Sequence, residues 1–506
     1  MTTYYISSAA TNGYVVGDNS NDGLAKSTPW RDLDSVASAA AVTDGDTVYI
    51  NGDMACDGEW TLGDTVTWIG EAGTRPVLTV RNGTAGSYGA RLATSGKTVT
   101  MQHLEFNEGL STSSLFNISP VALATLVLDD CKTVGNQYHV FCPTSGRVCG
   151  LTVTNCEAYS TALANLVYNG PTLGDASAIS ISGLKLDITS ASTSSKAVLS
   201  FVANAGTSCT CAIAGVTGTV NAATMGAGDT ASGIYIKHFD AAVIENCNIS
   251  IAVGTGAACN FYKITSTEAG LVLTSGYIRN NRGRTNAVGG ILITAGEDGG
   301  AYNGADAIQI YGNHMTGGPG DTTLHGVTFG GNISGHAYNN RVQNVYIGTL
   351  AKSASNIVFS HNVIERVDPD GQALRAKGAT DCTWSGNLHI VEGAYNGETI
   401  QLTLDDAGPT NSTGCVFDGN MIYAFYTATA QTTVVELQAS QTATFKGNVY
   451  YDAKGLPATG FLDGATAESL ADWNAESFVT GDVSFAFVPR QRVNIDKRLL
   501  SPVRGL

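Results

Sequence analysis

Charged side chains are scarce in this chain of 506 residues. They make up 14% of it, against roughly 25% in ordinary soluble proteins. Basic residues are scarcer than acidic ones, with 27 Lys and Arg against 43 Asp and Glu and a net charge of −16. Nucleic acid is therefore not an expected partner, because binding phosphates needs a basic surface. An apolar run of about 18 residues is also missing, so no membrane-spanning helix is expected.

Metal-binding and redox spacings are missing as well. The 11 cysteines include no C-x-x-C pair, and the histidines show no HxH or HxxxH spacing, so a zinc site is not expected. The cysteines are best interpreted as buried free thiols in a chain that folds in a reducing compartment. Residues 1–13 lack the charged and apolar regions of a secretion signal. The sequence thus predicts folding in the cytoplasm and release by another route, such as lysis.

A short pattern returns through the chain at intervals of about 20 to 35 residues. It consists of apolar residues, then a polar residue or Gly, then Asn. The copies are YIRNN (277–281), QIYGN (309–313), VFSHN (358–362), TWSGN (383–387), VFDGN (416–420) and TFKGN (444–448). Cys131, Cys156 and Cys247 take the place of Asn in earlier copies, and Asn107 and Gly215 are aligned with the same slot. A repeat of this period predicts a solenoid.

Each repeat contains short β-branched or aromatic runs separated by Gly, Asn, Asp and Ser, which favour turns. Helical periodicity between the runs is absent, so each repeat is predicted to be one coil of a parallel β-helix. Successive coils stack about 4.8 Å apart, and the recurring Asn can bond its own backbone and the Asn above it. This ladder is interpreted as structural. The repeat is blurred between about 160 and 235.

The two ends resemble the right-handed parallel β-helix proteins of the pectate-lyase-like superfamily. The motifs are YYIS (4–7), SNDGL (20–24), TPW (28–30) and GDTVY (45–49), with LLSP (499–502) near the other end. The resemblance implies an all-β, single-stranded right-handed parallel β-helix with a short helix at 28–41. The expected organisation is an N-terminal cap (1–50), coils (51–465) and a C-terminal cap with a basic tail (466–506). That tail either packs on the acidic rod or binds an anion or partner.

Relatives of this fold include polysaccharide lyases and hydrolases, epimerases and phage tailspikes, so the resemblance implies a polysaccharide ligand. The first hypothesis is a virion-associated tail fibre or tailspike, a homotrimer that contacts other tail proteins and recognises, and in some relatives depolymerises, a bacterial surface polysaccharide. The second is a free polysaccharide lyase or glycoside hydrolase acting on an acidic polysaccharide. The third is a structural rod without a ligand.

Aligning the repeats on Asn predicts that strand 374–377 stacks on 400–403 and then on 435–438. Alternation then points one polar set outward: Arg375, Lys377, Gln401, Thr403, Glu436 and Gln438. Arg375, Lys377 and Glu436 are the candidate catalytic residues. A Lys base beside an Arg that neutralises a uronate carboxylate resembles the arrangement in some β-helix lyases, and adjacent like charge and partial burial are expected to lower the pKa of Lys377. The alternative is two solvated cations paired with Glu436 or Glu365.

Gln401, Thr403, Gln438, Tyr395 and Tyr423 are the candidate substrate-binding residues. Further tyrosines that could stack on sugar rings are Tyr262, Tyr346 and Tyr426.

Calcium is the one cofactor that the sequence suggests. Glu365, Asp368 and Asp370 place three carboxylates within six residues, which suits calcium or an acid–base pair, although a solvated loop explains them equally. Residues 18–23 (DNSNDG) resemble the first half of a calcium loop, but Pro29 stands where the loop needs Glu.

Overall fold

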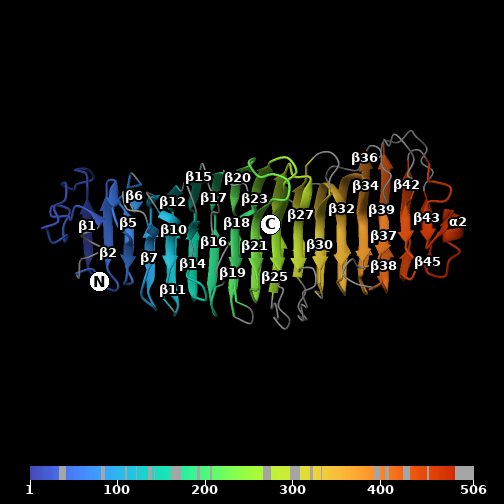
Figure 1. The fold of residues 1–506 in the computed structure, drawn as a ribbon, viewed down its shortest axis with the longest axis horizontal. Coiled ribbons are helices and arrows are strands. Elements are labelled where there is room, and N and C mark those ends of the chain that lie inside the picture. Colours follow the sequence, from blue (N-terminus) through green and yellow to red (C-terminus); the bar gives the residue numbers. More distant parts are fainter. Residues whose placement is uncertain are drawn as a thin grey trace, which may run out of the picture.

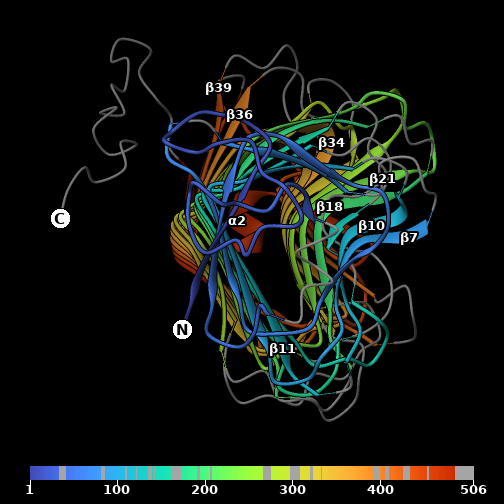
Figure 2. The same cartoon turned by 90° about the vertical axis from the view of Figure 1, so that its left-hand side faces the viewer.

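The computed structural model confirms a parallel β-helix. It describes residues 1–484 except 34–40, 74, 81–85, 109–110, 121, 135–138, 142, 161–172, 191–193, 205–207, 266–274, 297–307, 319–322, 332, 393–398, 405–409, 426–432 and 453–454. Strands from successive coils lie side by side along one long rod, and the chain advances through it in a single direction (Figure 1). Viewed from the N-terminal end, the strands form three faces around a central core (Figure 2).

The first face is a parallel sheet of 17 strands. It comprises β1 Thr3–Ser7, β2 Thr47–Asn51, β5 Thr67–Gly70, β8 Thr98–Gln102, β11 Ala124–Asp129, β14 Cys149–Thr154, β16 Ala178–Ser182, β19 Thr210–Ala214, β22 Ala241–Glu245, β25 Ser275–Arg279, β28 Ile308–Tyr311, β31 Gly335–Tyr338, β33 Ile357–Ser360, β35 Thr383–Ser385, β38 Cys415–Asp418, β41 Ala443–Lys446 and β45 Val479–Thr480.

The second face follows the first after a tight turn. It comprises β3 Met54–Cys56, β6 Val77–Val80, β9 Glu105–Glu108, β12 Lys132–Val134, β15 Glu157–Ser160, β17 Lys185–Thr189, β20 Thr217–Ala222, β23 Asn248–Val253, β26 Arg282–Thr285, β29 His314–Thr316, the first parts of β32 Arg341–Lys352 and β34 Val363–Lys377, β36 Leu388–Glu392, β39 Met421–Phe425, β42 Val449–Asp452 and β46 Val483–Ser484.

The third face completes each coil. It comprises β4 Trp60–Leu62, β7 Gly86–Leu92, β10 Ser111–Ile118, β13 His139–Phe141, β18 Lys196–Val202, β21 Thr230–Lys237, β24 Ala258–Thr265, β27 Gly289–Gly296, β30 Thr323–Gly330, the last parts of β32 and β34, β37 Ile400–Thr403, β40 Val435–Leu437 and β43 Phe461–Asp463. The strand β44 Thr466–Glu468 pairs antiparallel with β43, and α2 Leu470–Trp473 follows it.

One residue in the left-handed backbone conformation makes each turn from the first face to the second. Its φ lies between 51° and 70° in fourteen successive coils, at His103, Asp130, Asn155, Gly183, Gly215, Asn246, Asn280, Gly312, Asn339, His361, Gly386, Gly419, Gly447 and Gly481. Gly, Asn and Asp tolerate this conformation best, which explains why they precede the recurring Asn. The next residue is buried in every case, and we call this position the ladder slot.

The predicted asparagine ladder occupies the slot from Asn281 to Asn448. Asn387 is representative: its Nδ2 donates to Oδ1 of Asn420 at 2.9 Å and to the main-chain oxygen of Phe359 at 3.0 Å. Its Oδ1 accepts from the main-chain nitrogen and from Nδ2 of Asn362, both at 3.0 Å. The same pattern repeats from coil to coil, so every amide atom in this run of buried side chains has a partner.

Two alignments made from the sequence are wrong. Asn107 lies in β9 and pairs with Val134, and the slot in that coil is Leu104. Gly215 makes the turn, and the slot residue is Val216. Apolar residues thus fill some slots, which is why the repeat fades in the sequence while the coils continue.

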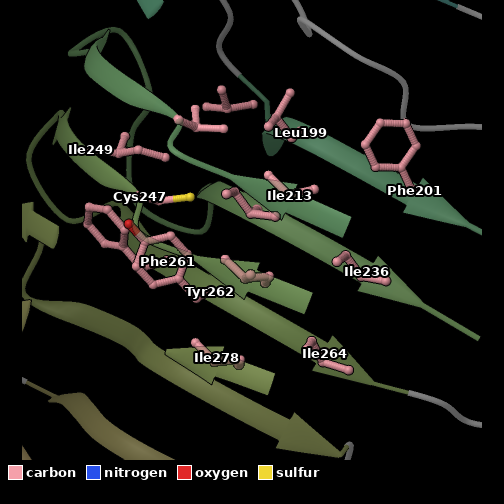
Figure 3. Close-up of a cluster of buried hydrophobic side chains, with 14 of the residues drawn as sticks. Leu199, Phe201, Ile213, Ile236, Cys247, Ile249, Phe261, Tyr262, Ile264 and Ile278 are labelled. Carbon is pink, nitrogen blue, oxygen red and sulfur yellow. The ribbon is translucent and has the colours of Figure 1, made fainter. Parts of the chain in front are cut away.

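Apolar side chains fill the interior of the rod. Figure 3 shows one cluster, in which Ile213 and Ile278 from the first face and Cys247 from the ladder slot lie near Ile236 and Ile264 from the third face. Further along, four aromatic rings stack one per coil with centroids 4.7 to 5.2 Å apart: Phe359, Trp384, Phe417 and Phe445. Ten cysteines in the described residues are buried and free, as predicted.

The two ends are described in part. The predicted helix at 28–41 falls largely on 34–40, and the basic tail falls on 485–506, so both lie outside the described residues. The strands β1 and β45 pair in parallel with β2 and β41, which extends the first face from residue 3 to residue 480. Among the described residues, no helix is long and apolar enough to cross a membrane.

Removing one ladder amide should destabilise the rod. In the Asn387→Ala variant, two buried donors of Asn362 lose their acceptor and the main-chain oxygen of Phe359 loses the side-chain donor. Oδ1 of Asn420 keeps only the bond from the main-chain nitrogen of residue 387. We expect unfolding to be easier by about 3 kcal/mol or more. Urea unfolding followed by circular dichroism measures this. The matched control, Asn248→Ala on an exposed position of β23, should leave the midpoint unchanged. Equal midpoints for the two variants would contradict the role of the ladder.

In the described part of the chain the last ladder residue is Asp482. Its Oδ1 accepts two bonds from Asn448, and its Oδ2 accepts from Tyr450. Burial raises the pKa of this carboxyl group, against the lowering effect of those donors. The pKa of Asp482 is higher in the folded protein than in the unfolded chain. Its contribution to the free energy of unfolding is therefore complete at low pH, where the group is neutral, and is lost as the pH rises through the folded pKa.

The Asp482→Asn variant should therefore be more stable than the natural chain at about pH 7, on the order of 1 kcal/mol, and equally stable at about pH 3. Thermal unfolding at both pH values checks this. Asp187→Asn, the same change at an exposed position of β17, serves as the control and should show no such difference. A stabilisation that is independent of pH would show that the charge of Asp482 is not its cause.

Candidate functional site

The polar strip predicted from the repeats lies on the third face. β34 pairs with β37 so that Arg375 lies beside Gln401 and Lys377 beside Thr403, and β37 pairs with β40 so that Gln401 lies beside Glu436. The predicted register is thus confirmed. The alternating residues face the core and are buried: Leu374, Ala376, Ile400, Leu402, Val435 and Leu437. We call Arg375, Lys377, Gln401, Thr403, Glu436 and Gln438 the polar strip.

Glu436 is the hydrogen-bonding centre of the polar strip. Its Oε2 accepts from Nε2 of Gln401 at 2.8 Å, and its Oε1 accepts from Nε2 of Gln438 at 3.1 Å. NH1 of Arg375 donates to Oε1 of Gln372 at 3.3 Å. Two amides thus hold the Glu436 carboxylate in place.

Gln401 has one side-chain atom that no described residue satisfies. The side chain is buried, with 8% exposed, and its Oε1 meets no hydrogen-bond donor in the described part of the chain. The amide cannot be turned to relieve this, because a carboxylate accepts only and Nε2 must face Glu436. A buried acceptor left unpaired costs about 1–3 kcal/mol, so a donor supplied by a ligand would be favourable here.

A second lysine joins the polar strip that the sequence did not assign to it. Lys352, at the end of β32, pairs directly with Lys377. Three basic residues therefore stand at one end of the strip and Glu436 at the other. Arg375 and Lys377 are two strands, or about 10 Å, from Glu436, and Lys352 is one strand further away. The sequence could not place Lys352, because β32 runs on from the second face to the third without a turn that would mark the register.

The tyrosines assigned from the sequence lie elsewhere. Tyr423 is on the second face, in β39, between Ile390 and Tyr451, and the structure does not bring it to the polar strip. Tyr262 is fully buried in the core, and its hydroxyl donates to the main-chain oxygen of Arg282 at 2.7 Å, so the prediction that it stacks on sugars is wrong (Figure 3). Tyr346 is half-buried in β32. Tyr395 and Tyr426 lie outside the described residues.

Of the three carboxylates assigned to metal, only the Glu365 side chain is described. Nε and NH2 of Arg341 donate to it at 2.8 to 3.1 Å, and Gln343 donates as well. The backbone of Asp368 and Asp370 lies in β34, with their side chains outside the described part. Glu365 therefore pairs with Arg341 on the second face and not with Arg375. Over the described residues, no three metal-binding side chains gather.

The loop that resembles half of a calcium site is closed by its own donors. Asp18 accepts from the main chain and hydroxyl of Ser20 at 2.8 and 2.7 Å, and these bonds lower the pKa of Asp18. Asp22 accepts from Leu24 and Thr28 at 3.1 and 2.9 Å, which lowers its pKa too. These carboxylates form the turn that leads into Trp30.

A row of aromatic side chains on the first face was not anticipated. Tyr311 and Tyr338 stack with centroids 4.8 Å apart, and NH1 of Arg279 donates to the Tyr311 hydroxyl at 3.0 Å while Arg279 also pairs with Glu245. These rings cover one another's faces, so the row is a cross-strand stack that offers edges and hydroxyls to solvent.

Comparisons with known proteins add little to the geometry. No protein-family profile matches the chain, and no curated protein matches it. Among solved structures, the chain is similar to the GH136 lacto-N-biosidase from Eubacterium ramulus, in its native form and as a selenomethionine derivative. Each match has 11% identity and a TM-score of 0.28 and covers 88% of this chain and 67% of the other.

Proposed function

We propose that this protein is a glycan-recognising β-helix whose polar strip binds an acidic polysaccharide lying across the third face. The observation that carries the proposal is the buried, unpaired Oε1 of Gln401, held between Arg375 and Glu436. A sugar hydroxyl would donate to that oxygen. Arg375 and Lys377 would pair with a uronate carboxylate, and Glu436 would accept from a further hydroxyl.

The setting that we propose is a phage-type tail fibre or tailspike that recognises a bacterial surface polysaccharide. A rod with few charges and a continuous outer face suits repeated contact with a polymer. Catalysis by a free lyase is the second candidate, favoured by the basic group of Arg375, Lys377 and Lys352. In that reaction, the neutral Lys377 amine would take the C5 proton beside the uronate carboxylate, whose charge Arg375 would neutralise. The C4=C5 double bond would form as the C4–O glycosidic bond breaks, and the leaving oxygen would take a proton from water.

A second surface supports association between copies of the chain. Apolar residues point outward from the second face in five successive coils: Val363, Leu388, Met421, Val449 and Val483, with Ile390, Tyr423 and Tyr451 beside them. We call this set the apolar stripe. It runs parallel to the rod axis, so copies aligned side by side could bury their stripes along a common length, and an exposed apolar patch of this kind is typical of an interface. We propose a homotrimer formed this way.

Substitutions in the polar strip should weaken glycan binding without unfolding the rod. For Gln401→Met and Arg375→Ala we expect affinities for acidic bacterial polysaccharides to fall about tenfold or more, measured by biolayer interferometry. Lys185→Ala, an exposed lysine of β17, is the control and should bind as the natural chain does. Unchanged affinity in both strip variants would overturn the proposed site.

An assay of product formation with the same polysaccharides distinguishes cleavage from binding alone. The ultraviolet absorbance of unsaturated uronates and the number of reducing ends are followed with the natural chain and with Lys377→Met. Elimination that disappears in Lys377→Met supports the lyase, whereas binding without either product supports recognition alone.

Breaking the apolar stripe should dissociate the assembly. A carboxylate introduced by Val449→Glu would be buried unpaired at the interface, so we expect a monomeric mass in light scattering where the natural chain forms trimers. The same change on the first face, Val358→Glu, should leave the trimer intact. A monomeric natural chain would contradict the homotrimer.

A further inference from the structure

Along the rod, the charge of one row of side chains on the second face changes. The row consists of the residues that directly follow the ladder slot, and it points outward. Near the N-terminus its charges alternate, as Glu105, Lys132, Glu157 and Lys185. Neighbours there pair, with Lys132 Nζ 3.1 Å from Glu105 and Lys185 Nζ 3.8 Å from Glu157. This is the arrangement that stacked strands favour, because opposite charges face each other.

In the middle of the rod the same row holds basic residues in succession. Arg282 of β26 pairs with His314 of β29, which pairs with Arg341 of β32, and Arg284 stands two residues after Arg282 on the same side. We call these four residues the basic cluster. Side chains in adjacent coils are about 4.8 Å apart, so like charges at these positions repel. The chain has only 27 Lys and Arg in 506 residues, so this concentration is not expected from composition.

Among the described carboxylates, Glu365 pairs with Arg341 of the basic cluster, and none pairs with the other two arginines. Glu365 is engaged by Arg341 and Gln343 and is itself nearly buried, with 11% of its side chain exposed. Within the described residues, neither Arg282 nor Arg284 has an acidic side chain within ion-pair distance. In the preceding coil, the residues that face them are the neutral Asn248 and Ser250. Arg282, Arg284 and His314 are exposed and accessible.

The strand beneath the basic cluster is rigidly held. The main-chain oxygen of Arg282 accepts from the buried hydroxyl of Tyr262 at 2.7 Å. Gly283, between the two arginines, packs so closely on the core that an added Cβ would lie 2.3 Å from Met315 and 3.0 Å from Phe261. The strand between the two arginines is thus packed closely on the core.

We infer that the basic cluster is an oxyanion-binding site for the sulfate or carboxylate groups of an acidic polysaccharide. The guanidinium groups of Arg282 and Arg284 would donate to the oxygens in paired bonds, and the anion would reduce the repulsion between them. Arg341, whose Nε and NH2 hold Glu365, would add positive charge nearby. The site lies on the second face and the polar strip on the third, so the inference does not depend on the proposed function of the strip.

His314 reports on occupancy of the site. His314 is exposed at its outer edge, but partial desolvation by its neighbours and the charges of Arg341 and Arg282 lower its pKa, while Gln343 and Glu365 act in the opposite direction. A bound anion beside the imidazole would stabilise its protonated form and raise that pKa. A histidine in a purely structural position would not respond to anions in this way.

The experiment measures binding to dextran sulfate, polygalacturonate and uncharged dextran at low salt. The natural chain is compared with the double variant Arg282→Gln, Arg284→Gln and with the control Lys132→Gln, Lys185→Gln on the same face. We expect the natural chain and the control to bind at least one polyanion with similar affinity. The affinity of the double variant should be lower by about tenfold or more, and none of the proteins should bind dextran. Preference for one polyanion identifies sulfate or carboxylate as the bound group.

A titration of His314 by nuclear magnetic resonance with and without inorganic sulfate completes the test, and we expect sulfate to raise its pKa. Combining Arg282→Gln and Arg284→Gln with Arg375→Ala should lower the affinity for polygalacturonate further than either change alone, because the basic cluster and the polar strip are separate sites. The inference is overturned if the natural chain binds neither polyanion, if the double variant and the control lose affinity equally, or if sulfate leaves the pKa of His314 unchanged.

Discussion

The chain of hydrogen bonds along the ladder slot is the constraint on which the rest of the rod depends. Each buried amide must find both its donors and its acceptors in the neighbouring coils, and it finds them only if every turn places the slot at the same level. A residue in the left-handed conformation before each slot makes that possible. From Asn281 to Asp482, one polar side chain per coil therefore fixes the register of the three faces.

Because the register between coils is fixed, it decides which side chains lie next to each other on the surface. Residues that are 22 to 34 positions apart in the sequence become neighbours in a row, because that is how far apart successive slots lie. Each row of stacked side chains can then be apolar, can alternate between positive and negative charges, or can carry charges of a single sign. The second face shows all three in turn, from the paired Lys132 and Glu105 through Arg282 to Leu388, so one fold presents several surfaces without changing its backbone.

The sequence predicted the fold and part of the polar strip because Asn marks the slot between Asn362 and Asn448. Counting from those marks placed Arg375 beside Gln401 and Glu436. The prediction failed where buried and exposed residues do not alternate along a strand. Phe261 and Tyr262 are consecutive and both fully buried, since the strand bends there, and an added Cβ at Gly233 would lie 2.5 Å from the main-chain oxygen of Phe261. The basic cluster was missed because its members are conspicuous only once the coils are stacked.

The ladder also has a direction. Every amide nitrogen donates toward the C-terminal neighbour, and the last slot holds Asp482, which as a carboxylate can accept but has nothing to pass on. A further coil stacked on it, whether from this chain or from another copy, would find no donor in the slot. Within the described residues, the run of directional amide bonds that starts at Asn281 therefore closes on an acceptor, the carboxyl group of Asp482.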